Sequence, residues 1–277
     1  MNFKSLKEKC LYYRNLVDYR LMPNSYTIIM LDGRAFSRCI KKKFSLPFDE
    51  KFISIMDRTA EYLCKNISGC KMAYIQSDEI SLILTDFDTS TRDSFFSLRL
   101  CKLQSIIASM ATGKFNQLML EHFLKENSND NKELSISTLL DMLNKQKLIE
   151  FDCKGWTVPT YNDMVAWLLF RQNDCIKNSK EQAAQAYFTH KELYHLTTDE
   201  QVRKLKDSYG IEWEAFTDGE KYGRFIYREN AIFHNIERDV VYKRNIWTIH
   251  PAFPLHTIEG RERFLGLNII PVLSMDS

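Results

Sequence analysis

Apolar residues recur along this chain in two patterns, and each pattern predicts a different kind of element. Spacing of three to four residues, typical of amphipathic helices, covers residues 3–20, 48–67, 92–124 and 161–189. Short apolar runs flanked by turn residues, typical of buried strands, cover residues 26–31, 70–76, 80–85 and 151–159. Residues 222–250 alternate like a further hairpin. We expect the helix over 92–124 to be interrupted near Gly113.

From residue 26 to residue 159 the predicted elements follow the order strand, helix, strand, strand, helix, strand, which is the ferredoxin-like βαββαβ arrangement. We therefore predict an α+β protein whose antiparallel sheet carries helices on one face. After it, the sequence predicts a mainly helical lobe with a β-hairpin. The expected domains are a core over residues 1–159, with a polar insertion at 125–150, and a lobe over 160–277.

Carboxylates interrupt the apolar pattern at the ends of the predicted strands. Asp32 follows the first strand, and Asp78 and Glu79 lie in the turn between the second and third. In the βαββαβ arrangement the first two strands are parallel with the third between them, so the three carboxylates meet at one edge of the sheet. A buried carboxylate costs several kcal/mol unless a positive group compensates it. These residues therefore form either an exposed turn or part of a cation site.

Carboxylates gathered in this way suit Mg²⁺, which takes oxygen ligands and keeps waters or substrate phosphates in its remaining positions. Two such ions about 4 Å apart stabilise the attacking and leaving oxygens of a phosphoryl transfer. Gly33 permits close approach of its backbone carbonyl as a further ligand. Arg99 and Lys102, one helical turn apart, are spaced to neutralise a triphosphate. This combination is typical of the palm of nucleotide polymerases and cyclases, and a general acid–base pair in a hydrolase is the alternative.

Composition narrows the class of protein further. The 277 residues are 44% apolar and 27% charged, values typical of a soluble globular protein. No apolar run approaches the roughly 20 residues of a membrane span, and residues 1–10 lack the apolar region of a signal peptide. The seven cysteines form no CxxC pair, which favours reduced thiols in the cytoplasm. Residues 34–43 carry five basic and no acidic residues, as a solvated loop or a phosphate-binding patch would.

Six sequence blocks match, in order and spacing, the signature of a known family. They are LDGRAFSR (31–38), FSLPFD (44–49), AYIQSDEISLIL (73–84), KLQSIIASMATGKFN (102–116), FDCKGWTVP (151–159) and FRQNDCIKNS (170–179). The chain thereby resembles the tRNA-histidine guanylyltransferase family, the 3′–5′ nucleotide polymerases, over nearly its whole length apart from residues 125–148. One DGR or SDE motif alone would carry no weight, whereas the six blocks together are specific.

The resemblance implies a polymerase-like palm, a fingers-like lobe and metal-dependent transfer of nucleotides to the 5′ end of tRNA. In that family ATP or GTP activates the 5′ phosphate, and the 3′-hydroxyl of an incoming NTP then displaces the nucleoside monophosphate. The resemblance also implies two Mg²⁺ ions, ATP and GTP or another NTP as substrates, tRNA as partner, and a homotetramer.

Carried over by position, the resemblance assigns roles to individual residues. The metal ligands would be Asp32, the Gly33 carbonyl and Asp78, and the catalytic acids would be Asp32, Asp78 and Glu79. The nucleotide would be bound by Gly33, Arg34, Ala35, Phe36, Ser37, Asp49, Ser77, Arg99, Lys102 and Asn178. Among these, Asp49 would read the base, and Arg99 and Lys102 would contact the triphosphate. Arg171 and Asp174, three residues apart on a predicted helix, are interpreted as a structural ion pair.

Three places depart from the family pattern. Ser37 stands where the family usually has His, and Leu46 replaces a basic residue, so nucleotide contacts are altered. Residues 176–179 read Ile-Lys-Asn-Ser instead of the His-Ile-Asn-Asn of eukaryotic members, which resembles the bacterial and archaeal "like protein" branch. We therefore favour template-dependent 5′-end repair over addition of G to tRNA-His. The alternatives are a catalytically weakened RNA-binding relative and, less favoured, a palm enzyme acting on free nucleotides.

Overall fold

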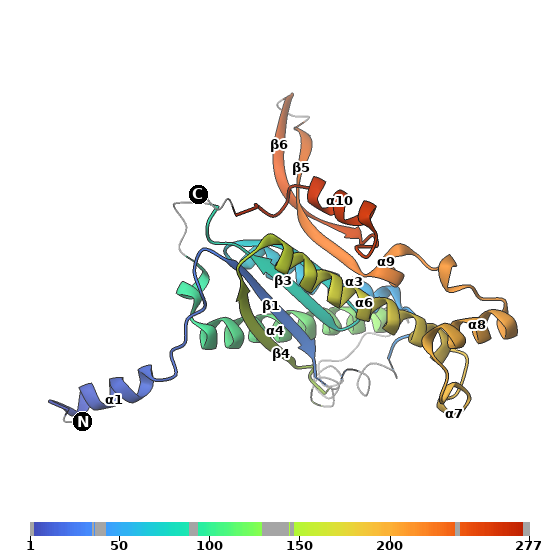
Figure 1. Ribbon diagram of the computed structural model, residues 1–277, viewed down its shortest axis with the longest axis horizontal. Helices are drawn as coiled ribbons and strands as arrows, with labels where there is room; N and C mark the ends of the chain where they lie inside the picture. Colours follow the sequence, from blue (N-terminus) through green and yellow to red (C-terminus); the bar gives the residue numbers. More distant parts are fainter. Residues whose placement is uncertain are drawn as a thin grey trace.

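The protein is built around a six-stranded antiparallel sheet with the strand order β4-β1-β3-β2-β5-β6 (Figure 1). The computed structural model describes residues 3–34, 36, 43–88, 94–128, 144, 147–235 and 239–273. The strands are β1 (Tyr26–Gly33), β2 (Cys70–Gln76), β3 (Glu79–Leu84), β4 (Phe151–Val158), β5 (Arg224–Asn235) and β6 (Val240–Pro251). β3 lies between β1 and β2 and is antiparallel to both, which confirms the predicted arrangement of the first three strands.

β1 is buried on both faces of the sheet, which explains its continuous apolar run. Ile29 and Leu31 pack on one side with apolar residues of α3 (Glu50–Asn66) and α4 (Leu100–Ser128). Tyr26 and Ile28 pack on the other side with apolar residues of α6 (Tyr161–Gln185) and α10 (Ile258–Gly266). The core helices α3 and α4 lie on one face, as we expected, while α6 and α10 from the region after residue 160 cover the other. A strand that is apolar at successive positions must be covered on both sides.

α4 runs without a break through Gly113, contrary to our expectation. A single glycine costs a helix about 1 kcal/mol relative to Ala, which is too little to interrupt one that buries Leu103, Ile107 and Phe115 in the core. The start of the helix also differs from the predicted residue 92. Phe96, Ser97 and Leu98, in the short 3-10 helix Phe95–Leu98, adopt positive φ values of 50, 50 and 56°, so α4 begins only at Leu100.

The hairpin predicted over 222–250 is formed by β5 and β6, and it extends the sheet beyond β2. Between α6 and β5 the chain forms the short helices α7 (His190–Leu193), α8 (Thr198–Tyr209) and α9 (Asp218–Tyr222), with a 3-10 turn at Trp213–Ala215. Of these elements, α8, α9 and the 3-10 turn pack with the end of α6 around Ala183, Leu205 and Trp213. A mainly helical region therefore follows β4 as predicted, whereas the division of the chain after residue 159 stays a prediction.

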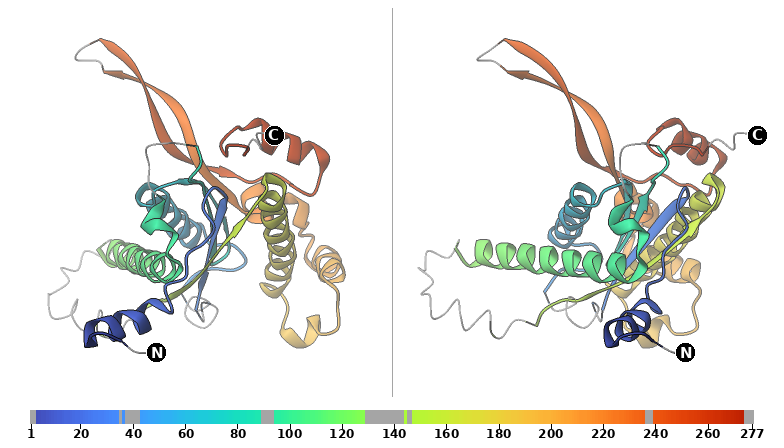
Figure 2. Two further views of the ribbon diagram at one scale, coloured as in Figure 1. Left: turned by 60° about the vertical axis from the view of Figure 1, so that its left-hand side comes forward. Right: turned by 90° about the vertical axis from the view of Figure 1, so that its left-hand side faces the viewer.

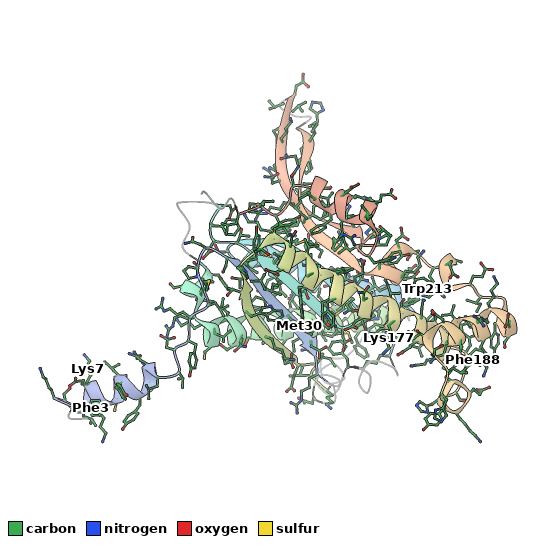
Figure 3. The ribbon with its side chains drawn as sticks, viewed as in Figure 1. Phe3, Lys7, Met30, Lys177, Phe188 and Trp213 are labelled. Carbon is green, nitrogen blue, oxygen red and sulfur yellow. The ribbon has the colours of Figure 1, made fainter. Side chains whose placement is uncertain are left out.

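Two elements project from the body of the molecule. The β5–β6 ribbon extends away from the sheet, and α1 (Leu6–Asn15) extends in a different direction with Phe3 and Lys7 near its end (Figures 2 and 3). No residue of α1 is buried. Most of the predicted polar insertion, residues 129–143 and 145–146, lies outside the described residues. Within the described part of the chain, no helix is both long and apolar enough to cross a membrane.

Candidate active site

A row of polar side chains crosses the sheet at the edge where β1 ends. Asp32 on β1 lies directly opposite Glu79 on β3 and Asp152 on β4. Directly opposed residues of antiparallel strands project from the same face, so the three carboxylates share the face that α6 covers. Asp78 lies beside them in the two-residue turn between β2 and β3, where Ser77 adopts the left-handed φ of 45°. The predicted meeting of the Asp32 and Asp78 segments at one edge is confirmed.

Burial and repulsion between negative charges raise the pKa values of both aspartate side chains. Burial raises the pKa of the Asp32 carboxyl, and the negative charge of Asp152 raises it further. Burial likewise raises the pKa of the Asp78 carboxyl, and the negative charge of Asp32 raises it further. Among the described residues, neither side chain has an ion-pair partner within 4.0 Å. A cation bound here would relieve both the burial and the repulsion.

Glu79 lies at the same edge, directly opposite Asp32, as we expected, but its charge is compensated by a cation of the chain itself. Its buried carboxylate is held by the guanidinium fork of Arg171, with 2.7 Å between Nε and Oε1 and a second short bond from Nη2 to Oε2. Arg171 also donates to Asp174 at 2.6 Å, so the ion pair inferred from their spacing is present. The main partner of Arg171 is nevertheless Glu79, 92 residues away. Sequence reasoning missed this role because nothing local in the chain signals the contact.

The side chains at this edge fit a magnesium ion that keeps several waters or phosphates. Within the described residues, no three His, Cys, Asp or Glu side chains lie close enough together to hold a metal by themselves. Two aspartates and the neighbouring Gly33 carbonyl would leave half of an octahedral shell to other ligands. Mg²⁺ dehydrates reluctantly and commonly binds through one or two carboxylates plus substrate phosphates. The donor set therefore suits Mg²⁺ bound together with a phosphorylated substrate.

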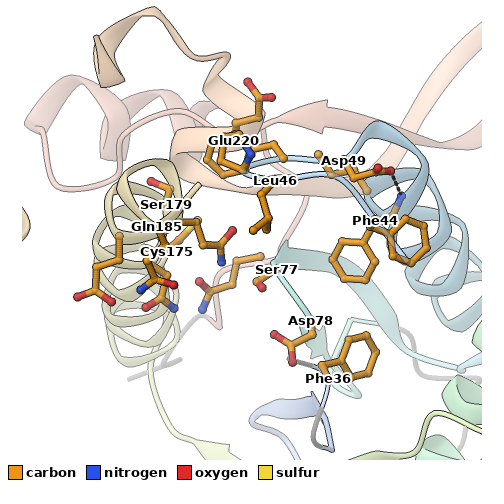
Figure 4. Close-up of a pocket in the computed structure, with 18 of the residues that line it drawn as sticks. Phe36, Phe44, Leu46, Asp49, Ser77, Asp78, Cys175, Ser179, Gln185 and Glu220 are labelled. Atoms are coloured by element: carbon orange, nitrogen blue, oxygen red, sulfur yellow. Dashed lines mark hydrogen bonds between the residues drawn. The ribbon is translucent and has the colours of Figure 1, made fainter. Parts of the chain in front are cut away.

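A large cavity opens from these carboxylates toward the helical region (Figure 4). Its volume is about 1010 Å³, at the upper end of the range found for small-molecule sites. Asp32 and Asp78 lie at one end, the segment from Phe44 to Asp49 forms one wall, and α6, α7 and α8 form another. The cavity is large enough for a nucleoside triphosphate. Predicted site residues that line it are Asp32, Gly33, Phe36, Asp49, Ser77, Asp78 and Asn178.

Asp49 lines the cavity, but its carboxylate is already engaged. It accepts backbone N–H groups from Ser45 (2.8 Å), Lys51 (2.8 Å) and Phe52 (3.1 Å), which caps the N-terminus of α3. Burial opposes ionisation of Asp49, but these donors outweigh it and hold its pKa below the usual value. Asp49 therefore shapes the cavity wall, and its reading of a base stays a prediction.

The predicted basic residues do not gather at the cavity. Arg34 forms an exposed ion pair with Glu150 at 2.8 Å. Arg99 pairs with Asp18 at 2.6 Å just before α4, and Lys102 lies over the Phe96 ring. None of Arg34, Arg99 and Lys102 is among the residues that line the cavity. Ala35, Ser37 and most of the basic stretch 34–43 lie outside the described residues.

Comparison with known proteins agrees with this architecture. Residues 9–159, more than half of the chain, match the model of the family described as tRNAHis guanylyltransferase, Thg1. A bacterial tRNA(His) guanylyltransferase (Thg1)-like protein, solved in complex with ATP, is 28% identical with a TM-score of 0.77, covering 96% of this chain and 99% of that one. A second structure of a bacterial Thg1-like protein, in complex with GTP, is 25% identical with a TM-score of 0.70, covering 97% of this chain and 100% of that one.

A curated relative extends the match beyond the bacterial structures. The tRNA(His) guanylyltransferase of Schizosaccharomyces pombe is 24% identical over 235 residues, which are 84% of this chain and 76% of that protein. The matched region includes the sheet edge with Asp32, Asp78 and Glu79. The chain therefore belongs to the tRNA(His) guanylyltransferase (Thg1) family.

Proposed function

We propose that this protein is a metal-dependent 3′–5′ nucleotidyltransferase that adds nucleotides to the 5′ end of tRNA. The observation that carries the proposal is the pair Asp32 and Asp78, which line a cavity of about 1010 Å³ and, among the described residues, have no ion-pair partner within 4.0 Å. The Thg1-like relatives solved with ATP and with GTP support nucleotides as the occupants. The cavity and the aspartates together supply what such a reaction requires of the chain.

The reaction would proceed by two displacements at phosphorus. An oxygen of the RNA 5′-monophosphate attacks the α-phosphorus of ATP or GTP, and pyrophosphate leaves. The 3′-hydroxyl oxygen of an NTP then attacks the activated 5′-phosphorus of the RNA, loses its proton, and the nucleoside monophosphate leaves. The chain's own contribution is to hold the reacting groups in line and to exclude water, which supplies a large part of such rate enhancements.

Asp32, Asp78 and the Gly33 carbonyl are the groups that would hold Mg²⁺, which when bound stabilises charge on the phosphates. The raised pKa values of both aspartates favour cation binding, because their negative charges are poorly solvated and repel each other. Glu79 acts differently, because Arg171 occupies both of its oxygens. We assign Glu79 to positioning neighbouring groups of the site.

We further propose template-dependent repair of tRNA 5′ ends as the reaction, rather than addition of G to tRNA-His alone. Residues 176–179, Ile-Lys-Asn-Ser, differ from the eukaryotic pattern, and Asn178 and Ser179 line the cavity. The likeness to bacterial Thg1-like structures over nearly the whole chain supports the same assignment. A homotetramer, with RNA contacts shared between subunits, remains part of this proposal.

The test uses a 5′-labelled, monophosphorylated tRNA that lacks its first nucleotide, incubated with Mg²⁺, ATP and each NTP in turn. Extension by the Watson–Crick nucleotide, lost in Asp78→Asn and kept in the matched surface variant Asp207→Asn, is the expected result. Addition of G alone, and only to tRNA-His, would replace repair by the guanylyltransferase reaction. Binding of tRNA without any extension would leave a catalytically inactive RNA-binding relative.

A further inference from the structure

Gln76 is a buried residue of the cavity wall, and its side-chain oxygen has no hydrogen-bond partner among the described residues. It ends β2, directly opposite Glu79, and therefore continues the polar row of Asp152, Asp32 and Glu79 onto a fourth strand. The residue lines the cavity yet is only 2% exposed. Among the described residues, its side-chain oxygen Oε1 has no hydrogen-bond partner. A buried acceptor without a donor is costly and calls for an explanation.

The orientation of the Gln76 amide is determined by its neighbours. The guanidinium fork of Arg171 contacts both oxygens of Glu79, which fixes that carboxylate in place. Gln76 lies directly opposite Glu79 on the same face of the sheet, and its side chain lowers the pKa of the Glu79 carboxyl. A carboxylate only accepts hydrogen bonds, so the NH₂ end of the amide must face Glu79 and Oε1 must face away from it. The chain Arg171–Glu79–Gln76 thus presents a fixed acceptor beside the Ser77-Asp78 turn.

The chemistry of a nucleotide limits what can reach this acceptor. Phosphate oxygens are acceptors themselves, so only the sugar hydroxyls and the N–H groups of the base can donate to Oε1. The position of Gln76, two residues from Asp78 and in register with Asp32 across β3, is close to where the phosphates would lie. The sugar is the part of a nucleotide next to its phosphates. A nearly covered oxygen also admits a small group such as a hydroxyl more readily than the broad edge of a base.

We infer that Gln76 is a specificity-determining residue whose Oε1 accepts a hydrogen bond from a ribose hydroxyl of the bound nucleoside triphosphate, with Glu79 and Arg171 as its positioning residues. This inference rests on the proposed function, because it takes a nucleotide as the occupant of the cavity. It predicts discrimination between ribonucleotides and deoxyribonucleotides at the level of binding. It also gives the Glu79–Arg171 pair a role that requires no metal contact from Glu79.

The test measures binding calorimetrically on the full chain with Mg²⁺ and without RNA, using ATP, 2′-deoxy-ATP, 3′-deoxy-ATP and inosine triphosphate. One deoxy analogue should bind wild-type protein about 3- to 10-fold more weakly than ATP, the range for one neutral hydrogen bond. Gln76→Met, similar in volume, should bind ATP as weakly as that analogue and lose the discrimination. Glu79→Gln should reduce it, because a neutral amide no longer orients Gln76.

The matched control is Gln201→Met. Gln201 on α8 also lines the cavity with an unpartnered Oε1, while its amide nitrogen donates to the Leu196 carbonyl at 3.1 Å. This variant should keep the ratio between ATP and its deoxy analogues. Equal binding of all three by wild-type protein overturns the inference and leaves the nucleotide function standing, and a loss with inosine triphosphate alone moves the contact to the base. Absence of any nucleotide binding overturns both the inference and the proposed function.

Discussion

Replacing Arg171 by Met should destabilise the protein strongly, because it leaves the Glu79 carboxylate buried without a counter-charge. The two side chains are only 12% and 8% exposed, and the fork contacts both oxygens of the carboxylate. Removing one partner of a buried ion pair typically costs about 3 to 5 kcal/mol. That cost is a large part of the total free energy of unfolding, which for most proteins is about 5–15 kcal/mol.

The same reasoning predicts the outcome of the double variant. With Glu79→Gln added, no buried charge remains to be compensated, because Asp174 is partly exposed, so Arg171→Met/Glu79→Gln should regain much of that cost. Urea unfolding followed by circular dichroism measures both free energies. The exposed pair Arg58–Glu121, whose side chains are 45% and 37% exposed, is the matched control. Arg58→Met should cost less than about 1 kcal/mol.

The pH dependence provides a second check on the cause. Burial raises the pKa of Glu79 above 4.5 even though Arg171 lowers it, so loss of Arg171 should raise it further. The folded variant then binds a proton that the unfolded chain does not, and its stability should rise as the pH falls toward 4.5. The cost of Arg171→Met should therefore shrink between pH 8 and pH 5. The buried-pair explanation would be refuted if the stability losses of Arg171→Met and Glu79→Gln simply added in the double variant and if the loss in Arg171→Met did not change with pH.

Three further predictions follow from the surroundings of the site. Asp152→Asn removes a negative charge that raises the pKa of Asp32, so the acid limb of the pH–rate profile of nucleotide transfer should move to lower pH. A Cβ at Gly33 would lie 2.0 Å from the Phe36 ring, so Gly33→Ala should cost about 1–3 kcal/mol in urea unfolding. A Cβ at Gly113, inside α4, would have no atom within 4 Å. Gly113→Ala should therefore stabilise the protein by about 0.5–1 kcal/mol in the same assay, and a loss of stability would contradict a regular helix at this position.

The sequence by itself determined the elements and the place where the two aspartates meet. The spacing of apolar residues is a local property of the sequence. This spacing distinguishes helices from strands before any tertiary contact is known. The order of elements then constrains which strands pair, and this brings Asp32 next to the Ser77-Asp78 turn. The hypothesis of a cation site followed, because carboxylates that are buried together are costly unless a positive group compensates them.

Only the tertiary structure decided which charged residues serve the site. Glu79 is bound by Arg171 because α6 docks on the sheet face that carries Glu79, and a contact across 92 residues leaves no local pattern. Arg99 pairs with Asp18 and does not line the cavity, although it lies within the region that matches the family. Gln76 is an ordinary polar residue in the sequence, and only its burial opposite Glu79 leaves Oε1 without a donor. Pairing and burial depend on how elements pack, so residue type and spacing could not predict them.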